Sequence, residues 1–289
     1  MDRSNSYISL TQAAELLGVH YMTAYRYVRT GRLPAHKVGQ EWRVDPAAVE
    51  ALLHDADTDV ASGGRGRRRD RTVGLVDRLT RSDEAGAWAI IEDSVNGGMD
   101  VDAVYLELLA PALEQVGDRW AIGEVTIAQE HQASALVLRL IGRLGPRFAR
   151  RGRKRGTLVV GAPAGDVHGL PSALLSDLMR GRSFTVIDLG ADVPAASWAS
   201  TCAESTRLQG VGICASTPGN DDEIRAALSA IRSTTAVPAV LGGNGVTDQA
   251  HALGLGASAF SDSFESAVEL LDAAGSATEL GSAPPRTAS

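Results

Sequence analysis

The carboxyl-terminal half of the sequence alternates five times between short β-rich runs and helical stretches. The runs that predict strands are TLVVGA (157–162), FTVIDLG (184–190), GVGICAS (210–216), PAVLGG (238–243) and ASAFS (257–261). Helical stretches follow them at 170–180, 195–205, 221–231, 249–255 and 264–273. This alternation predicts an α/β doubly wound parallel sheet over 149–273, with its ligand site at the carboxyl ends of the strands. The Gly-, Ser-, Ala- and Pro-rich segment 274–289 predicts a disordered tail.

The middle of the chain predicts a four-helix bundle over 73–148. Apolar residues recur at three-and-four spacing in the stretches 87–95, 101–116 and 126–145, and residues 73–79 supply a fourth short helix. Before the bundle, residues 55–72 lack apolar periodicity and combine an acidic block, a Ser-Gly-Gly hinge and an arginine run. We expect a flexible linker there.

The amino-terminal segment, residues 1–54, predicts a small helical module with a β-hairpin. A helix capped by Thr11 ends at Gly18, and a second helix follows at 21–29. The segment HKVGQEWRV alternates around Gly39-Gln40 as a two-stranded wing would, and Asp45-Pro46 opens a third helix at 47–53. The second helix should expose five side chains: Tyr21, Met22, Tyr25, Arg26 and Arg29.

This pattern resembles the winged helix-turn-helix of MerR-type and excisionase-type proteins. The resemblance implies binding to a double-stranded DNA operator, with the five exposed side chains of helix 21–29 in the major groove and Lys37 and Arg43 of the wing on phosphates. Arg26 is the best candidate for reading a base, because a guanidinium can fork onto guanine. One module meets few phosphates, so we expect a homo-oligomer, a dimer or a tetramer, on repeated half-sites.

The charge of the chain is divided unequally along its length. The net charge of the whole chain is −7, but the part up to Arg71 holds 11 basic and 9 acidic residues, a net charge of +2. The remaining part carries −9. A front end of such low charge should bind DNA weakly as a monomer, and usefully only on oligomerisation. With two cysteines and no apolar run long enough to cross a bilayer, we expect a cytoplasmic protein that does not enter membranes.

A candidate ligand site follows the first predicted strand of the sheet. Asp166 precedes His168 by two residues, in a loop at the ligand-binding edge. A carboxylate at this spacing can accept a hydrogen bond from the imidazole, which fixes the tautomer and raises the basicity of the other ring nitrogen. This arrangement suits a metal-ligating histidine, although an Asp-x-His pair by itself is also found as a capping Asp beside a surface His.

The loop and sheet resemble the Rossmann-like cobalamin-binding domain, whose motif is Asp-x-His-x-x-Gly, then Ser-x-Leu or Ser-x-Thr, then Gly-Gly. Here Asp166-Val-His168-Gly-Leu-Pro171 is followed by Cys214-Ala-Ser216 and Gly242-Gly243. The resemblance implies that His168 is the lower axial cobalt ligand, oriented by Asp166, and that Gly242 and Gly243 let the backbone approach the nucleotide tail. Two positions depart from the motif. Pro171 replaces its last glycine, and Cys214 replaces a serine that would bond the tail, a loss for which Ser216 could compensate.

A second motif lies in the helical segment, where Trp120 is followed ten positions later by Glu130-His131. With the winged helix in front and the Asp-x-His loop behind, this order resembles the CarH/LitR family of adenosylcobalamin-dependent, light-responsive MerR-type regulators. The resemblance implies that Trp120, Glu130 and His131 contact the 5′-deoxyadenosyl group on the upper face. A histidine that directly follows this Trp in well-understood members is Ala121 here, so that residue cannot fill the upper cobalt site after light.

We therefore expect a transcriptional regulator rather than an enzyme, with adenosylcobalamin as its cofactor and light as its signal. Ligand-linked oligomerisation would control DNA binding. Two alternatives stay open: a light-independent sensor of cobalamin, which Ala121 makes more credible, and a corrinoid carrier of methyl groups, against which the winged helix argues.

Overall fold

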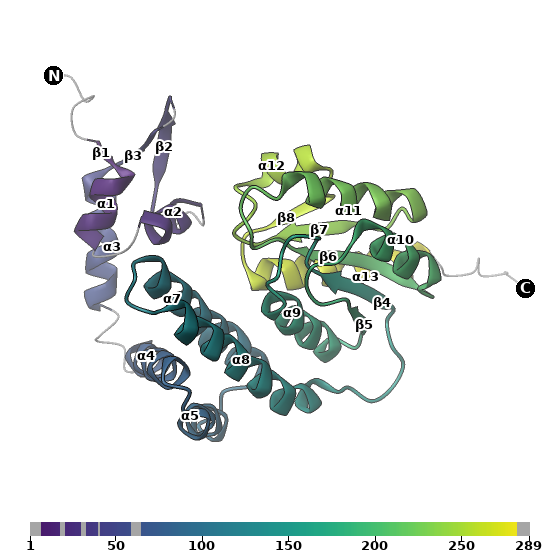
Figure 1. Cartoon of the computed structure of the whole chain (residues 1–289), viewed down its shortest axis with the longest axis horizontal. Coiled ribbons are helices and arrows are strands. Elements are labelled where there is room, and N and C mark those ends of the chain that lie inside the picture. Colours follow the sequence, from purple (N-terminus) through teal and green to yellow (C-terminus); the bar gives the residue numbers. More distant parts are fainter. Residues whose placement is uncertain (1–6, 18–20, 30–32, 40, 59–64, 282–289) are drawn as a thin grey trace, which may run out of the picture. The chain divides into compact units, whose positions relative to one another are not determined.

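The computed structural model describes residues 7–17, 21–29, 33–39, 41–58 and 65–281 (Figure 1). These form two compact units, Met1–Val137 and Leu138–Ser289, so the boundary falls inside one helix, α8 (Ile127–Leu144). The sequence had suggested a boundary near residue 148, after this helix.

The first unit begins with three helices and a small antiparallel sheet. The elements are β1 (Ile8–Ser9), α1 (Leu10–Leu17), α2 (Tyr21–Arg29), β2 (Ala35–Val38), β3 (Glu41–Val44) and α3 (Pro46–Thr58). The strands are ordered β1-β3-β2, and Val38 pairs with Glu41 across the hairpin. Ala13, Ala24, Leu33, Val44 and Val49 form the centre of a buried apolar cluster between the helices and the sheet.

The cap of α1 differs from the predicted one. Ser9 and Gln12 bond reciprocally, with the Gln12 amide donating to Ser9 Oγ at 3.2 Å and the Ser9 amide donating to Gln12 Oε1 at 3.0 Å. This is a capping box, so Ser9 and not Thr11 starts the helix. The order of elements matches the prediction, including a third helix that begins at Pro46.

The remainder of the first unit is helical. It contains α4 (Arg65–Thr80), α5 (Glu84–Asn96), α6 (Val101–Ala103), a π-helical turn at Val104–Leu109, α7 (Ala110–Ala121) and the first part of α8. Helix α4 packs on α5, on α7 and on the π-helical turn, and these elements bury Leu75, Leu79, Ile91 and Leu108. Because α3 extends to Thr58 and α4 starts at Arg65, much of the predicted linker 55–72 is helical; residues 59–64 lie outside the described part of the chain.

The second unit contains the predicted parallel sheet. Its strands are β4 (Thr157–Gly161), β5 (Thr185–Asp188), β6 (Leu208–Cys214), β7 (Ala239–Gly242) and β8 (Ala259–Ser261). They are ordered β5-β4-β6-β7-β8, and every neighbouring pair is parallel. Strand β4 is buried at all five positions, as expected for a strand covered on both faces.

Five helices connect and cover these strands: α9 (Leu170–Gly181), α10 (Ala195–Glu204), α11 (Asp221–Thr234), α12 (Gln249–Leu255) and α13 (Phe264–Gly281). Helices α9 and α13 pack together on one face of the sheet, and α10 and α11 pack together on the other (Figure 1). Trp198, Ile224, Leu228 and Leu241 belong to the buried core on the α10–α11 side.

The carboxyl-terminal helix is longer than predicted. Helix α13 continues to Gly281, so residues 274–281 are helical and not part of a disordered tail; residues 282–289 lie outside the described part. Among the described residues, no helix has the length and apolar character needed to cross a membrane.

Candidate functional site

The strand order of the second unit determines where a ligand site is expected. The order β5-β4-β6-β7-β8 means that the chain leaves β4 toward one side and reaches β6 on the other, so β4 and β6 flank the topological switch point. Ligands of doubly wound sheets bind outside the carboxyl ends of the strands at this point. Asp166 and His168 lie in the loop after β4, and Ser216 and Thr217 directly follow β6.

Asp166 is the most buried carboxylate of this site, with no exposed surface. Its Oδ1 lies 2.7 Å from His168 Nδ1 and also accepts a hydrogen bond from the His168 amide at 3.1 Å. Its Oδ2 accepts hydrogen bonds from the amides of Ser216 and Thr217 at 2.5 and 3.1 Å. The Asp166 side chain therefore joins the loop after β4 to the loop after β6.

The hydrogen bonds also determine the charge of Asp166. Burial by itself raises the pKa of this carboxyl, but the hydrogen bonds from His168 and from the amides of Ser216, Thr217 and His168 favour the ionised form and lower the pKa to about 2. Asp166 is thus a carboxylate at neutral pH. A carboxylate only accepts hydrogen bonds, so the Nδ1 of His168 must donate, and the lone pair of the neutral ring lies on Nε2.

The imidazole of His168 is suited to bind a metal of a cofactor. Its side chain is 55% exposed although its Asp166 partner is fully buried. Histidine ligands commonly donate their second ring N–H to a carboxylate, which orients the ring and raises the basicity of the ligating nitrogen. The predicted pairing of Asp166 with His168 is present in the structure; ligation of cobalt by His168 stays a prediction.

Neighbouring loops hold the Asp166 loop in place through residues that sequence reasoning missed. The Gly165 amide donates to Asp192 Oδ1 at 2.8 Å, and Asn220 donates to the Ala164 carbonyl at 2.8 Å. Thr217 Oγ1 lies 3.5 Å from His168 Nδ1. Asp192, Thr217 and Asn220 all follow strands at the carboxyl edge, which is the one sequence signal that could have pointed to them.

The positions that depart from the cobalamin motif lie in ordered surroundings. Pro171 occupies the first turn of α9, where its missing N–H costs no helical hydrogen bond. Cys214 is the last residue of β6 and is buried. Burial, with the nearby negative charges of Asp188 and Asp166, raises the pKa of its thiol to about 12, so it stays a neutral, weak donor.

Gly242 and Gly243 have a structural role of their own. A Cβ on Gly243 would lie 2.2 Å from the Ala215 carbonyl oxygen, and one on Gly242 would lie 2.7 Å from that of Ser261. Gly243 also has φ +113°, a conformation that L-residues rarely adopt. The close approach of the chain to itself therefore requires both glycines, and their predicted contact with a nucleotide tail stays a prediction.

In the first unit, Trp120, Glu130 and His131 flank the turn between α7 and α8. Trp120 is the second-last residue of α7 and is 50% exposed. Glu130 Oε2 lies 2.8 Å from His131 Nδ1, and Glu130 Oε1 accepts a hydrogen bond from Ser134 Oγ at 2.7 Å. The Thr126–Gln129 capping box, which starts α8, fixes the turn. Glu130 and His131 are thus hydrogen-bonded to each other, with the histidine largely exposed, and their contact with an adenosyl group stays a prediction.

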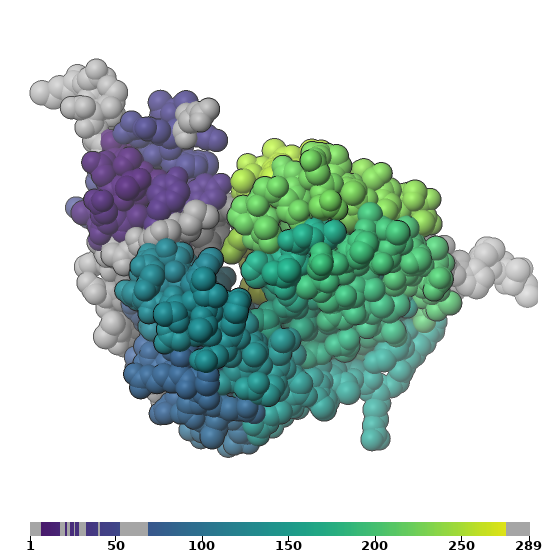
Figure 2. Space-filling model, viewed as in Figure 1, coloured from purple at the N-terminus to yellow at the C-terminus, as the bar shows by residue number. Residues whose placement is uncertain are grey.

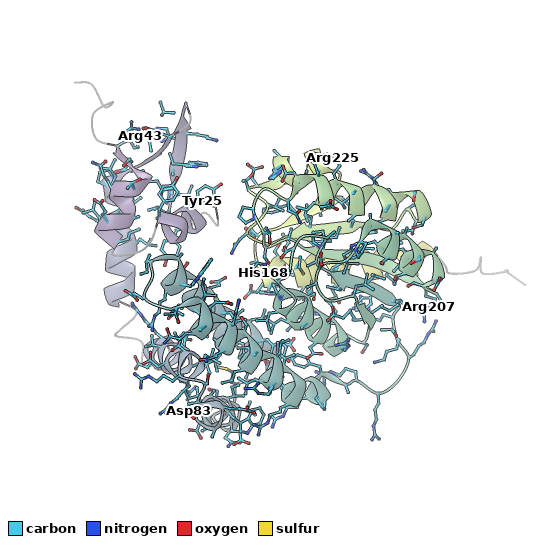
Figure 3. The ribbon with its side chains drawn as sticks, viewed as in Figure 1. Tyr25, Arg43, Asp83, His168, Arg207 and Arg225 are labelled. Atoms are coloured by element: carbon cyan, nitrogen blue, oxygen red, sulfur yellow. The ribbon has the colours of Figure 1, made fainter. Side chains whose placement is uncertain are left out.

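The predicted DNA-contacting residues lie on α2 and on the hairpin. The rings of Tyr21 and Tyr25 stack with centroids 6.5 Å apart, and Tyr25 packs edge-on against Trp42 at 6.3 Å. Tyr25, which was expected to be exposed, is therefore partly buried against the apolar cluster; Figure 3 labels it together with Arg43. Lys37 lies over the Trp42 ring, with its Nζ 5.8 Å from the centroid. Arg43 forms an ion pair with Glu41 at 2.9 Å, which partly offsets its charge. The side chains of Met22, Arg26 and Arg29 lie outside the described residues.

The sequence matches two known protein families, each over part of the chain. Residues 7–56 match a helix-turn-helix domain, and residues 74–144 match a B12 binding domain. The second match contains Trp120, Glu130 and His131 and ends before the sheet of the second unit.

The chain is also similar to several corrinoid proteins. It is 24% identical over 121 residues to trimethylamine corrinoid protein 1 of Methanosarcina acetivorans, a match that covers 41% of this chain and 56% of that protein. It is 23% identical over 208 residues to a corrinoid protein of Desulfitobacterium hafniense, covering 68% of this chain and 96% of the relative. The chain thus spans little more than half the length of the methylamine-related proteins.

A solved structure agrees with the fold. The Methanosarcina barkeri monomethylamine corrinoid protein superposes with a TM-score of 0.59 at 18% identity, covering 70% of this chain and 97% of the other. At that identity the likeness concerns the fold, a mixed helical and parallel-sheet architecture. Together, the B12 binding domain match and the corrinoid relatives support cobalamin as the cofactor of this chain, and the helix-turn-helix match indicates a DNA-binding-like amino terminus.

Proposed function

We propose that this chain is a cobalamin-binding transcriptional regulator whose cofactor state controls oligomerisation and DNA binding, with adenosylcobalamin as the ligand and light as the signal. The observation that carries the sensory half of this proposal is the Asp166–His168 pair at the switch point of the sheet. The helix-turn-helix match at residues 7–56 supports the regulatory half.

His168 is the residue we assign to cobalt. The donor set fits this role, because a neutral imidazole with its lone pair on Nε2 is a good ligand for a transition metal. Asp166 holds the ring in that tautomer through Nδ1. The remaining lone pairs of Asp166 accept the amides of Ser216 and Thr217, so the carboxylate cannot turn away from the ring without losing two hydrogen bonds.

We assign contact with the adenosyl group of the cofactor to three residues of the first unit: Trp120, Glu130 and His131. Bound adenosylcobalamin would supply a light-sensitive cobalt–carbon bond. The half-exposed Trp120 ring offers an aromatic face that excludes water from such a bond, and Glu130 and His131 offer polar groups for ribose and adenine. Because Ala121 has no side chain able to ligate cobalt, any protein ligand that replaced the adenosyl group would have to come from another residue, such as His131.

The proposed winged helix-turn-helix binds DNA through α2 and the β2–β3 hairpin. Lys37 is exposed, and Tyr21 is also exposed at the start of α2. The part up to Arg71 has a net charge of only +2, so a single module neutralises few phosphates. Assembly of several modules would then be the step that gives useful affinity.

Cofactor and assembly are coupled by linkage in this proposal. A ligand shifts an assembly equilibrium only by its difference in affinity for the two states, and about 3 kcal/mol of difference shifts it roughly a hundredfold. Adenosylcobalamin must therefore bind the oligomer better than the monomer, and illumination must remove that difference.

The central experiment has two readouts. Purified protein with adenosylcobalamin, in the dark, should show a visible spectrum that changes in His168→Ala but not in His36→Ala, a histidine of the hairpin. Gel filtration and operator binding should then show a large species in the dark and a smaller, weaker-binding one after green light. An unchanged spectrum in His168→Ala overturns the ligand assignment, and an unchanged size and DNA affinity after light overturns the light switch.

A second candidate is a corrinoid carrier of methyl groups, favoured by the corrinoid proteins to which this chain is similar. A light-independent cobalamin sensor is a third, favoured by Ala121. DNA affinity measured in darkness with methyl-, adenosyl- and hydroxocobalamin separates them. A sensor should bind DNA differently with the three forms, and a carrier should bind no DNA specifically with any of them.

A further inference from the structure

A second concentration of positive charge lies in the second unit, outside the helix-turn-helix match. Six of the nine residues 147–155 are basic and none is acidic. They lie between the short 3-10 helix Gly145–Phe148 and strand β4, in a part of the chain whose net charge is −9. The basic residues are Arg147, Arg150, Arg151, Arg153, Lys154 and Arg155.

Backbone hydrogen bonds place this segment at the amino-terminal edge of the sheet. The Arg155 amide donates to the Ser183 carbonyl before β5, and the Thr157 amide donates to the Arg207 carbonyl before β6. Arg207 thereby joins the basic segment, and we call residues 147–155 together with Arg207 the basic strip. Arg207 and His168 lie at opposite ends of the sheet domain, so the strip is separate from the candidate cofactor site (Figure 3).

Carbonyl groups orient several of these side chains without neutralising them. Arg207 donates to the carbonyls of Lys154 and Arg155 at 2.9 and 2.7 Å, and Arg150 donates to that of Gly181 at 3.1 Å. Lys154 donates to the Arg150 carbonyl at 3.0 Å. The strip is therefore partly ordered before any ligand binds.

Among the described residues, a single member of the strip has a carboxylate partner. Arg155 pairs with Asp272. Within the part of the chain that the structure describes, none of the other basic residues of the strip forms an ion pair with a carboxylate. Five of its described side chains are exposed and present charge without a carboxylate partner: Arg147, Arg150, Arg151, Arg153 and Arg207. Figure 2 shows a narrow teal projection from this part of the second unit.

We propose that the basic strip binds the phosphate backbone of duplex DNA. Residues 150–155 span at most roughly 20 Å, and duplex DNA carries a charge about every 1.7 Å of its axis, so several arginines can meet phosphates together. The contact would be independent of sequence. It would add affinity to a helix-turn-helix segment whose own charge is low.

The composition of the strip favours duplex DNA over other polyanions. Its single aromatic residue, Phe148, is buried, so no ring is available to stack on the bases of a single strand. Its other non-basic residues are Ala149 and Gly152, which offer little apolar surface to insert into a lipid interface.

The test measures DNA affinity over a range of salt concentrations for the full chain. The variant is Arg151→Gln with Arg153→Gln, and the matched control is Arg81→Gln with Arg225→Gln, which removes the same charge from exposed positions outside the strip. With a random-sequence duplex, the slope of log affinity against log salt should fall by about 1.8 in the strip variant, roughly 0.9 for each lost contact. The control should keep the wild-type slope.

This inference rests on the proposed DNA-binding function, and a third variant separates the two. Lys37→Ala with Arg43→Ala removes the hairpin contacts. If this variant binds as wild type while the strip variant is weakened, the helix-turn-helix assignment fails and the strip assignment stands. An unchanged slope in the strip variant, or an equal fall in the control, overturns the strip assignment. If the strip variant loses binding to phosphatidylserine vesicles but keeps the wild-type salt dependence of DNA binding, the strip binds a lipid surface and the DNA assignment is overturned.

Discussion

The Nδ1 atom of His168 lies 2.7 Å from Oδ1 of the fully buried Asp166, and this one hydrogen bond decides which ring nitrogen can act as a ligand. Asp166 accepts three further hydrogen bonds, from the amides of Ser216, Thr217 and His168. Burial raises its pKa, but these bonds and the one from the imidazole lower it to about 2 and hold the side chain as a carboxylate. The relationship therefore couples the conformation of two loops to the chemistry of one exposed imidazole.

Replacing Asp166 with Asn should weaken cobalamin binding about ten- to a hundredfold, the usual effect of losing such a supporting group. If the Asn oxygen faces His168, its NH₂ group opposes the amides of Ser216 and Thr217; if the NH₂ group faces His168, Nδ1 must accept and the proton moves to Nε2. Either orientation disfavours the ligating state. Spectral titration with hydroxocobalamin measures the effect, with Asp100→Asn, at the helix cap of α6 in the first unit, as the control. Wild-type affinity in Asp166→Asn contradicts the role assigned to this carboxylate.

Asp83 should make the stability of the protein depend on pH. Hydrogen bonds from the Gly86 amide and from Arg78 lower the pKa of this helix-capping carboxyl below its ordinary 3.8. The charged form is thus favoured by folding, so its contribution is fully present above about pH 4 and is lost as pH falls through the folded pKa. Asp83→Asn keeps a capping side chain and removes the charge. Urea unfolding measured from pH 6 downward should show that the wild type is more stable than Asp83→Asn at pH 6. The difference in free energy of unfolding between them should shrink as the pH falls. A difference that stays constant with pH would show that the charge of Asp83 is not its source.

Gly243 should be one of the least replaceable residues of the sheet domain. An alanine there combines φ +113° with a Cβ 2.2 Å from the Ala215 carbonyl oxygen, so we expect Gly243→Ala to lower the free energy of unfolding by about 2 kcal/mol or more. Gly254 lies in α12 with open space around its Cβ position. Gly254→Ala should be neutral or stabilising by up to about 1 kcal/mol. Equal effects of the two variants in urea unfolding would show that the close approach at Gly243 is not required.

Both cysteines should be unreactive in the native protein. Burial raises the pKa of Cys202 to about 11, and burial with the charges of Asp188 and Asp166 raises that of Cys214 to about 12. Because the thiolate is the nucleophile, an aromatic disulfide reagent at pH 8 should react with neither thiol on the timescale on which it titrates both in urea. Rapid release of one equivalent of chromophore from folded protein would contradict the buried positions.

The sheet could be predicted because its central strands, β4, β6 and β7, are largely buried and read as apolar runs. The edge strand β5 is exposed or half-buried at all four positions. The predicted element boundaries are wrong where the apolar pattern of the sequence weakens. Strand β6 begins at Leu208, two residues before the predicted start at Gly210. The prediction missed these residues because the polar Gln209 interrupts the apolar run, although its side chain is buried in the structure. Helix α13 continues to Gly281 through a Gly-, Ser- and Ala-containing stretch that has the composition of a tail.

The candidate site was predictable to the extent that it is local in sequence. The spacing of Asp166 and His168 is enough to predict their hydrogen bond, and the structure confirms it. Thr217, Asp192 and Asn220 come from other loops, and only the strand order brings them to the same edge. The close approach of Ala215 to Gly243 is likewise a tertiary contact, so sequence reasoning assigned the glycine to a ligand and missed its structural role.

Trp120 should contribute to binding the upper ligand of the cofactor and little to folding. Its side chain is 50% exposed at the end of α7, so Trp120→Ala should change the free energy of unfolding by less than about 1 kcal/mol. If the indole covers the adenosyl group, its loss should weaken adenosylcobalamin binding roughly tenfold, equivalent to about 1.4 kcal/mol. Hydroxocobalamin lacks that group, so its affinity should not change. Ile127, which is 60% exposed across the same turn, gives the matched control Ile127→Ala. Dark titrations of both variants with both cobalamins test the assignment, and equal losses for the two cobalamins in Trp120→Ala would place the tryptophan elsewhere than over the upper ligand.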